Sequence, residues 1–260
     1  MMCCTTTKPA VQPITPLLRK DYPMKKTLTT IAVLALCLMF SPMVYAGPIT
    51  EFIIDNFTQP GTAYSVYRSD IGLSGVSTVT GLPTSDVVGG VRTMQINVTS
   101  TSGNYSTLTV NPAATGTLSF SNDSGQNSTA MITWDANGAG LGGVDITNGG
   151  TLLYLQADIL ASDLNLGFRV DITELGGGGD TAYWSTSLGS GASVVNQALS
   201  GFTNAGAVDF TEVNKIVLTL TGPVAQDGML DVLKVTTPEP ATMALLAFGS
   251  LGLLVRRKRS

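Results

Sequence analysis

Short segments in which apolar and polar residues alternate dominate the chain between residues 47 and 237. A period of two places the apolar side chains on one face of an extended strand. Clusters of Gly, Asn, Ser and Asp separate these segments and predict turns. The pattern therefore predicts an all-β domain of short antiparallel strands, and the clearest apolar rows are Met94, Ile96 and Val98; Phe168, Val170 and Ile172; and Ile216, Leu218 and Leu220.

The segments with this pattern define the expected topology. About 190 residues are ample for one sandwich core and few for two. We therefore expect an antiparallel β-sandwich with a jelly-roll arrangement, in which the first and last strands are neighbours, and helical turns at 84–88 and 194–199. The predicted strands are 51–57, 63–68, 91–99, 106–110, 117–121, 130–134, 152–159, 166–173, 181–185, 214–220 and 229–235.

Two local features carry separate predictions. Arg92 shares the parity of Met94, so we expect it at the edge of the core with its aliphatic stem packed and its guanidinium reaching water.

Residues 138–143 match G-x-G-x-x-G, but the following residues, Val144–Thr147, suggest an extended segment. A dinucleotide site needs a helix there, so we predict a loop.

Charge is sparse and unevenly distributed. Only 12% of the 260 residues are charged. Residues 47–237 hold five basic residues and 16 acidic ones, a net charge of −11. Such a body repels phosphate backbones, which argues against nucleic-acid binding.

Histidine and cysteine limit the chemistry. The chain has no His, and Cys3, Cys4 and Cys37 all precede residue 47. This removes His-dependent nucleophilic pairs, His-ligated zinc and body disulfides. Catalysis would have to use carboxylates, yet Glu51, Glu174 and Glu212 show no recognisable pairing. We expect a protein that is not an enzyme.

The N-terminal region has the three parts of a secretory signal. Lys25 and Lys26 precede an apolar run at 27–40, and Val44 and Ala46 supply residues −3 and −1 of a cleavage site. We predict a signal peptide with an apolar helix at 24–46 and a mature N-terminus at Gly47. We also expect translation to start at Met24, so that residues 1–23 are not part of the natural protein.

The C-terminal region combines three elements. Pro238-Glu239-Pro240 interrupts the last strand, and residues 241–255 form an apolar run, about 22 Å long as a helix at 1.5 Å per residue. We predict a transmembrane helix, short for a hydrocarbon core of about 30 Å. The basic cluster after it should remain cytoplasmic and leave the body outside the inner membrane; its members are Arg256, Arg257, Lys258 and Arg259.

These three elements, in this order, resemble the PEP-CTERM sorting signal of exopolysaccharide-producing Gram-negative bacteria. The resemblance covers about 23 residues (238–260) within the C-terminal segment 237–260, and Thr237 stands where a Val often precedes the first Pro. It implies recognition by an exosortase, transient anchoring in the inner membrane, removal of the tail, and delivery to the cell surface or extracellular matrix.

The body, residues 47–236, resembles carbohydrate-binding-module-like jelly rolls in its pattern. That resemblance implies carboxylates for calcium on the first and last strands, for which Asp55, Asp227 and Asp231 are the candidates; no other cofactor is expected. Tyr183 and Trp184 point to opposite faces of a strand, so at least one ring is available to stack on a sugar. The sequence thus predicts a structural protein of the cell surface or the biofilm matrix. One alternative is a carbohydrate-binding module that binds matrix polysaccharide, and a second is a carboxylate-dependent glycosidase.

Overall fold

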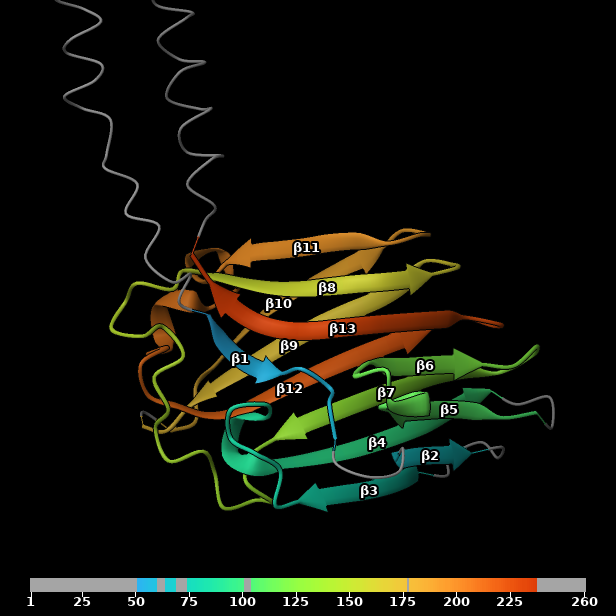
Figure 1. The fold of residues 1–260 in the computed structure, drawn as a ribbon. Helices are drawn as coiled ribbons and strands as arrows, with labels where there is room; N and C mark the ends of the chain where they lie inside the picture. The colour runs from blue at the N-terminus through green and yellow to red at the C-terminus, as the bar shows by residue number, and fades with distance from the viewer. Residues whose placement is uncertain (1–50, 60–63, 69–73, 101–103, 177, 238–260) are drawn as a thin grey trace, which may run out of the picture. The chain divides into compact units, whose positions relative to one another are not determined.

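A computed structural model describes residues 51–59, 64–68, 74–100, 104–176 and 178–237. These residues form two antiparallel β-sheets packed face to face (Figure 1). The fold is the predicted all-β sandwich. The predicted signal helix and transmembrane helix lie outside the described residues. The described residues include no helix that could span a membrane.

The first sheet has seven strands. Its order is β11-β8-β13-β6-β5-β2, and β1 also pairs with β13. The strands are β1 (Phe52–Asp55), β2 (Tyr64–Arg68), β5 (Ser106–Val110), β6 (Leu118–Asn122), β8 (Tyr154–Ser162), β11 (Ser193–Ala198) and β13 (Asp227–Thr236).

The second sheet has six strands in the order β10-β9-β12-β7-β4-β3. Single turns of 3-10 helix, η1 to η4, connect strands at the edges of the sandwich. The strands are β3 (Ser74–Thr80), β4 (Val91–Ser100), β7 (Asn127–Trp134), β9 (Leu166–Glu174), β10 (Thr181–Leu188) and β12 (Val213–Gly222); the turns are Val88–Gly90, Pro112–Ala114, Leu199–Gly201 and Ala205–Ala207.

The terminal strands of the domain are neighbours, as predicted. Phe52 pairs with Val235 and Ile53 with Lys234 in an antiparallel ladder. Two strands were missed. The segment of β3 is rich in Ser and Thr and holds only two apolar side chains, Val76 and Val79, too few for a convincing apolar row. The helical turn expected at 194–199 is wrong, because β11 occupies 193–198 and the 3-10 turn follows it.

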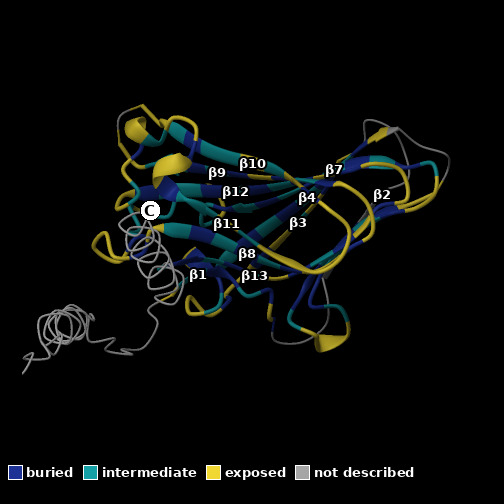
Figure 2. Ribbon diagram, turned by 90° about the horizontal axis from the view of Figure 1, so that it is seen from above, coloured by how far each residue is buried: buried dark blue, intermediate teal, exposed yellow. Residues whose placement is uncertain are grey.

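The core lies between the two sheets. Buried residues line the facing surfaces and the exposed residues gather in the loops (Figure 2). Phe168, Val170 and Ile172 on β9 are buried, and so are the residues at the same parity on β12. The alternation in the sequence therefore identified the inner faces correctly.

Arg92 corrects one expectation. Its side chain is fully buried rather than reaching solvent. Its Nε donates to Asp55 Oδ2 and its Nη2 to Asp55 Oδ1, both at 2.5 Å. Asp55 also accepts from Trp134 Nε1 at 2.9 Å and from the backbone N of Phe57 at 2.7 Å. The parity of Arg92 predicted its place on the inner face, and the Asp55 carboxylate on β1 compensates the buried charge.

The glycine-rich segment 138–143 is a loop, as predicted. Residues 135–150 contain turns and one isolated bridge, from Val144 to Val213, and no helix. Gly140 has φ +83°, and a Cβ at this position would collide with the Asn214 side chain. The glycine here is needed both for its backbone conformation and for close approach to β12.

Candidate functional sites

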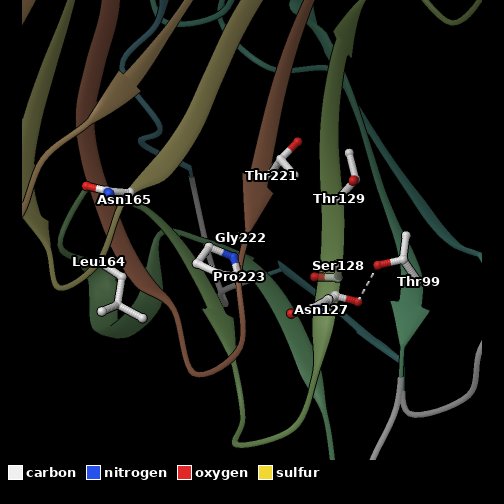
Figure 3. A pocket seen from close by; sticks show the side chains of 9 residues that line it. All are labelled: Thr99, Asn127, Ser128, Thr129, Leu164, Asn165, Thr221, Gly222 and Pro223. Carbon is white, nitrogen blue, oxygen red and sulfur yellow. Dashed lines mark hydrogen bonds between the residues drawn. The ribbon is translucent and has the colours of Figure 1, made fainter.

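A groove of about 730 Å³ crosses the end of the six-stranded sheet. Three neighbouring strands, β12, β7 and β4, contribute to it together with the turn that precedes β9 (Figure 3). Leu164 and Asn165, in the turn before β9, form one side, and Thr99 on β4 lies at the other. Its remaining lining residues are Asn127, Ser128, Thr129, Thr221, Gly222 and Pro223.

The chemistry of this groove is polar and uncharged. Hydroxyl groups and amides line it, together with the apolar side chains of Leu164 and Pro223, and none of its described lining residues is charged. Thr99 Oγ1 donates to the backbone oxygen of Asn127 at 3.1 Å. Asn127 Oδ1 is buried and has no hydrogen-bond partner among the residues that the structure describes. Such a surface can exchange hydrogen bonds with a neutral, hydroxyl-rich ligand.

Buried hydrogen bonds hold the floor of the groove. The Asn122 side-chain amide donates to the backbone oxygens of Gly222 and Pro223, each at 3.1 Å. Ser128 Oγ donates to Asn122 Oδ1 at 2.5 Å. A Cβ at Gly222 would lie 2.6 Å from the Phe120 ring, so glycine permits this close approach. The end of β12 is therefore fixed in place beneath the groove.

Tyr183 and Trp184 point to opposite faces of β10, as predicted. Trp184 packs inward, 5.5 Å from the Phe168 ring centroid and 6.4 Å from that of Phe202. Tyr183 lies on the outer face beneath the Arg169 guanidinium, 3.9 Å from its ring centroid. The two rings therefore do not form one stacking platform. Sugar stacking by Tyr183 stays a prediction.

Arg169 itself is held by a neighbouring carboxylate. Its Nη2 and Nε donate to Asp171 at 2.6 and 2.8 Å. The hydrogen bond to Asp171 raises the pKa of Arg169. The Arg169 guanidinium is therefore fixed in orientation and covers one face of the Tyr183 ring.

The three calcium candidates are not gathered into one cluster. Asp55 is buried and its carboxylate is occupied by Arg92, Trp134 and the Phe57 amide. Burial raises the pKa of Asp55, and the hydrogen bond and charge of Arg92 oppose that rise. Asp227 and Asp231 are exposed on β13. Among the residues that the structure describes, no group of three or more carboxylates could hold a metal ion.

Another carboxylate organises the loop between β7 and β8. Asp145 accepts from Thr147 N at 2.8 Å, Thr147 Oγ1 at 2.7 Å and Gly149 N at 2.7 Å. Burial alone would raise the pKa of Asp145, but these donors outweigh it and hold the pKa below its usual value. The carboxylate is fully used inside its own loop, which indicates a structural role.

The residues predicted for export and sorting lie outside the described part of the chain. β13 ends at Thr236, and only Thr237 separates it from Pro238. The residues concerned are the cleavage-site group Val44, Ala46 and Gly47, the motif Pro238-Glu239-Pro240, and the basic cluster Arg256, Arg257, Lys258 and Arg259.

The groove and the buried ion pair were not anticipated from the sequence. Thr99, Asn127, Asn165 and Thr221 stand at strand ends in a chain rich in such residues, and nothing in their spacing connects them. The parity of Arg92 was a usable signal, because a cation in an apolar row requires a partner.

Comparison with known families identifies the C-terminal region. Residues 236–259 match the PEP-CTERM protein-sorting motif, which begins at the residue where β13 ends. The resemblance inferred from the sequence is confirmed. No curated protein matches the chain.

Solved structures similar to the chain include carbohydrate-binding modules. A family 11 module from Clostridium thermocellum, in complex with a β-1,3-1,4-mixed-linked tetrasaccharide, is 14% identical with a TM-score of 0.38, over 74% of this chain and 98% of the module. The module TmCBM61, in complex with β-1,4-galactotriose, is 11% identical with a TM-score of 0.32, over 67% and 88%. An exo-β-agarase is 14% identical with a TM-score of 0.39, over 75% of this chain and 25% of the agarase. These likenesses concern the fold alone.

Proposed function

We propose that this chain is an exported structural protein of the cell surface or extracellular matrix, delivered by an exosortase. The observation that carries the proposal is the PEP-CTERM motif at residues 236–259. Its position supports cleavage, because β13 ends at Thr236 and the motif begins there. Removing the tail would leave every described strand of the sandwich intact.

The partners of three described carboxylates favour a structural role for these acids over a catalytic one. Glu51 pairs with Lys234 at 3.0 Å, and Glu174 Oε2 accepts from the backbone N of Asp209 at 2.9 Å. Asp55 is enclosed by its ion pair with Arg92. Each of these acids has a partner that explains its presence. A carboxylate-dependent glycosidase is the less favoured proposal.

The sorting proposal is tested by fractionating cells of a host that encodes an exosortase. Wild-type protein should reach the cell surface or the medium. Replacing Pro238, Glu239 and Pro240 by Ala should leave the apolar tail in place and trap the protein in the inner membrane. Deleting residues 238–260 should release a soluble body into the periplasm. Surface delivery of the triple-Ala variant at the wild-type level would contradict the proposal.

The groove favours a second candidate function, the binding of a neutral matrix polysaccharide. The uncharged hydroxyl and amide lining supports it, and so does Asn127 Oδ1, which is buried without a partner in the described part of the chain. Thr221→Lys should fill the groove and abolish retardation of the exported protein in gels containing a neutral polysaccharide. Thr93→Lys is the matched control, since Thr93 lies on β4 of the same sheet and outside the groove lining. Equal retardation of the two variants would refute binding in the groove.

A further inference from the structure

The outer edge of β3 lacks the charges and prolines that normally protect the edge of a sheet. Natural edge strands carry charges, prolines or bulges that prevent pairing with another chain. Ser74–Thr80 contains no charged residue and no proline. All seven residues pair with β4 in an unbroken register, from Ser74 with Asn97 to Thr80 with Val91. Among the described residues, none pairs with the opposite side of this strand.

Two of the other end strands are protected. In the six-stranded sheet, β10 is covered by Thr203, which exchanges backbone hydrogen bonds with Tyr183 at 3.1 and 2.9 Å. In the seven-stranded sheet, β2 has only five residues, and a short edge strand offers little backbone for pairing. The fourth end strand, β11, is uncharged like β3 but has six residues and only two β-branched ones, Val194 and Val195.

The composition of β3 favours strand pairing. Four of its seven residues are β-branched, and Val76 is 59% exposed on the outer face. β-branched side chains pack well against cross-strand neighbours. An added strand would cover Val76 and satisfy the outward-facing backbone groups at the same time.

We propose that β3 pairs antiparallel with β3 of a second copy of this chain and joins two six-stranded sheets into one. A second copy fits the charge of the molecule. The body carries a net charge of −11, so two copies repel each other wherever carboxylates meet, but two β3 strands bring no charges together.

Symmetry sets the register of this pairing. A two-fold axis at Ser77 aligns all seven residues and places Val76 of each copy opposite Thr78 of the other. Cα atoms of directly opposed residues are about 4.5–5.5 Å apart in antiparallel sheets. The two Ser77 residues then face each other within the range that a disulfide spans. The two Thr80 residues lie six positions apart, about 20 Å at ~3.3 Å per residue.

Cysteine substitution tests the register in the full chain. All three native cysteines precede residue 47, so replacing Cys3, Cys4 and Cys37 by Ser provides a background without thiols. After export and oxidation, Ser77→Cys should give a disulfide-linked dimer. Thr80→Cys, at a more exposed position of the same strand, should not. Absence of the Ser77→Cys dimer, or an equal dimer yield from Thr80→Cys, would overturn the proposal.

A charge at the edge provides an independent test. Sedimentation of the exported protein should show dimers for wild type and for Val76→Thr, and monomers for Val76→Lys. Val194→Lys adds the same charge to β11, where Val194 is also 59% exposed, and should leave the dimer intact. Circular dichroism melting reports whether each variant folds. Wild type sedimenting as a monomer, or dissociation by Val194→Lys and not by Val76→Lys, would contradict pairing through β3.

Discussion

Removing Arg92 should destabilise the sandwich more than removing any surface cation. Arg92→Met leaves the Asp55 carboxylate fully buried with two remaining donors, the Phe57 amide and Trp134 Nε1. Loss of one partner from a buried ion pair costs about 3–5 kcal/mol, because the other charge stays desolvated. Total stabilities are about 5–15 kcal/mol, so this is a large fraction.

Urea unfolding followed by tryptophan fluorescence measures this loss, since Trp134 and Trp184 both lie in the described domain. Arg169→Met is the matched control: Arg169 pairs with Asp171 on the surface and its side chain is 44% exposed, so the cost should be below ~1 kcal/mol. The double change Asp55→Leu with Arg92→Met should recover part of the loss. A cost for Arg92→Met no larger than that of the control would refute the reasoning.

Two further predictions concern packing and pH. Leu218→Ala should lower the free energy of unfolding by about 2–5 kcal/mol, because Leu218 is fully buried, whereas Thr219→Ala on the outer face should cost well under 1 kcal/mol in the same urea titration. The pKa of Asp145 is lowered by its loop donors, so its contribution to stability is present above the ordinary carboxyl pKa of about 3.9 and is lost as pH falls through the folded-state value. Asp145→Asn should therefore show a smaller loss of unfolding free energy on acidification than wild type; identical pH curves would exclude this role.

The sequence predicted the fold class well because the signal is local. The alternation along β9 and along β12 identifies which side of each strand faces the core, without reference to any other strand. The pairing of β1 with β13 was also expected from the jelly-roll pattern and is confirmed. β3 was missed because its two apolar residues, Val76 and Val79, face opposite sides of the strand and so form no apolar row in the sequence.

The sites depended on contacts that are distant in the sequence. Asp55 and Arg92 are 37 residues apart, and only the folded sheets show that the carboxylate is enclosed by Arg92 and not available on the surface with Asp227. The groove unites Thr99, Asn127 and Thr221 through sheet order, which no local pattern encodes. The sorting motif, in contrast, is contiguous in the sequence and was recognised directly.

The mass of the mature protein tests the sorting proposal most directly. In a host that encodes an exosortase, intact-mass analysis of the exported wild-type protein should show a C-terminus within or before Pro238-Glu239-Pro240, without the apolar run and without Arg256–Arg259. The variant with these three residues replaced by Ala should retain Ser260. If wild type also retains Ser260, the tail is a plain membrane anchor and the proposed sorting route is wrong.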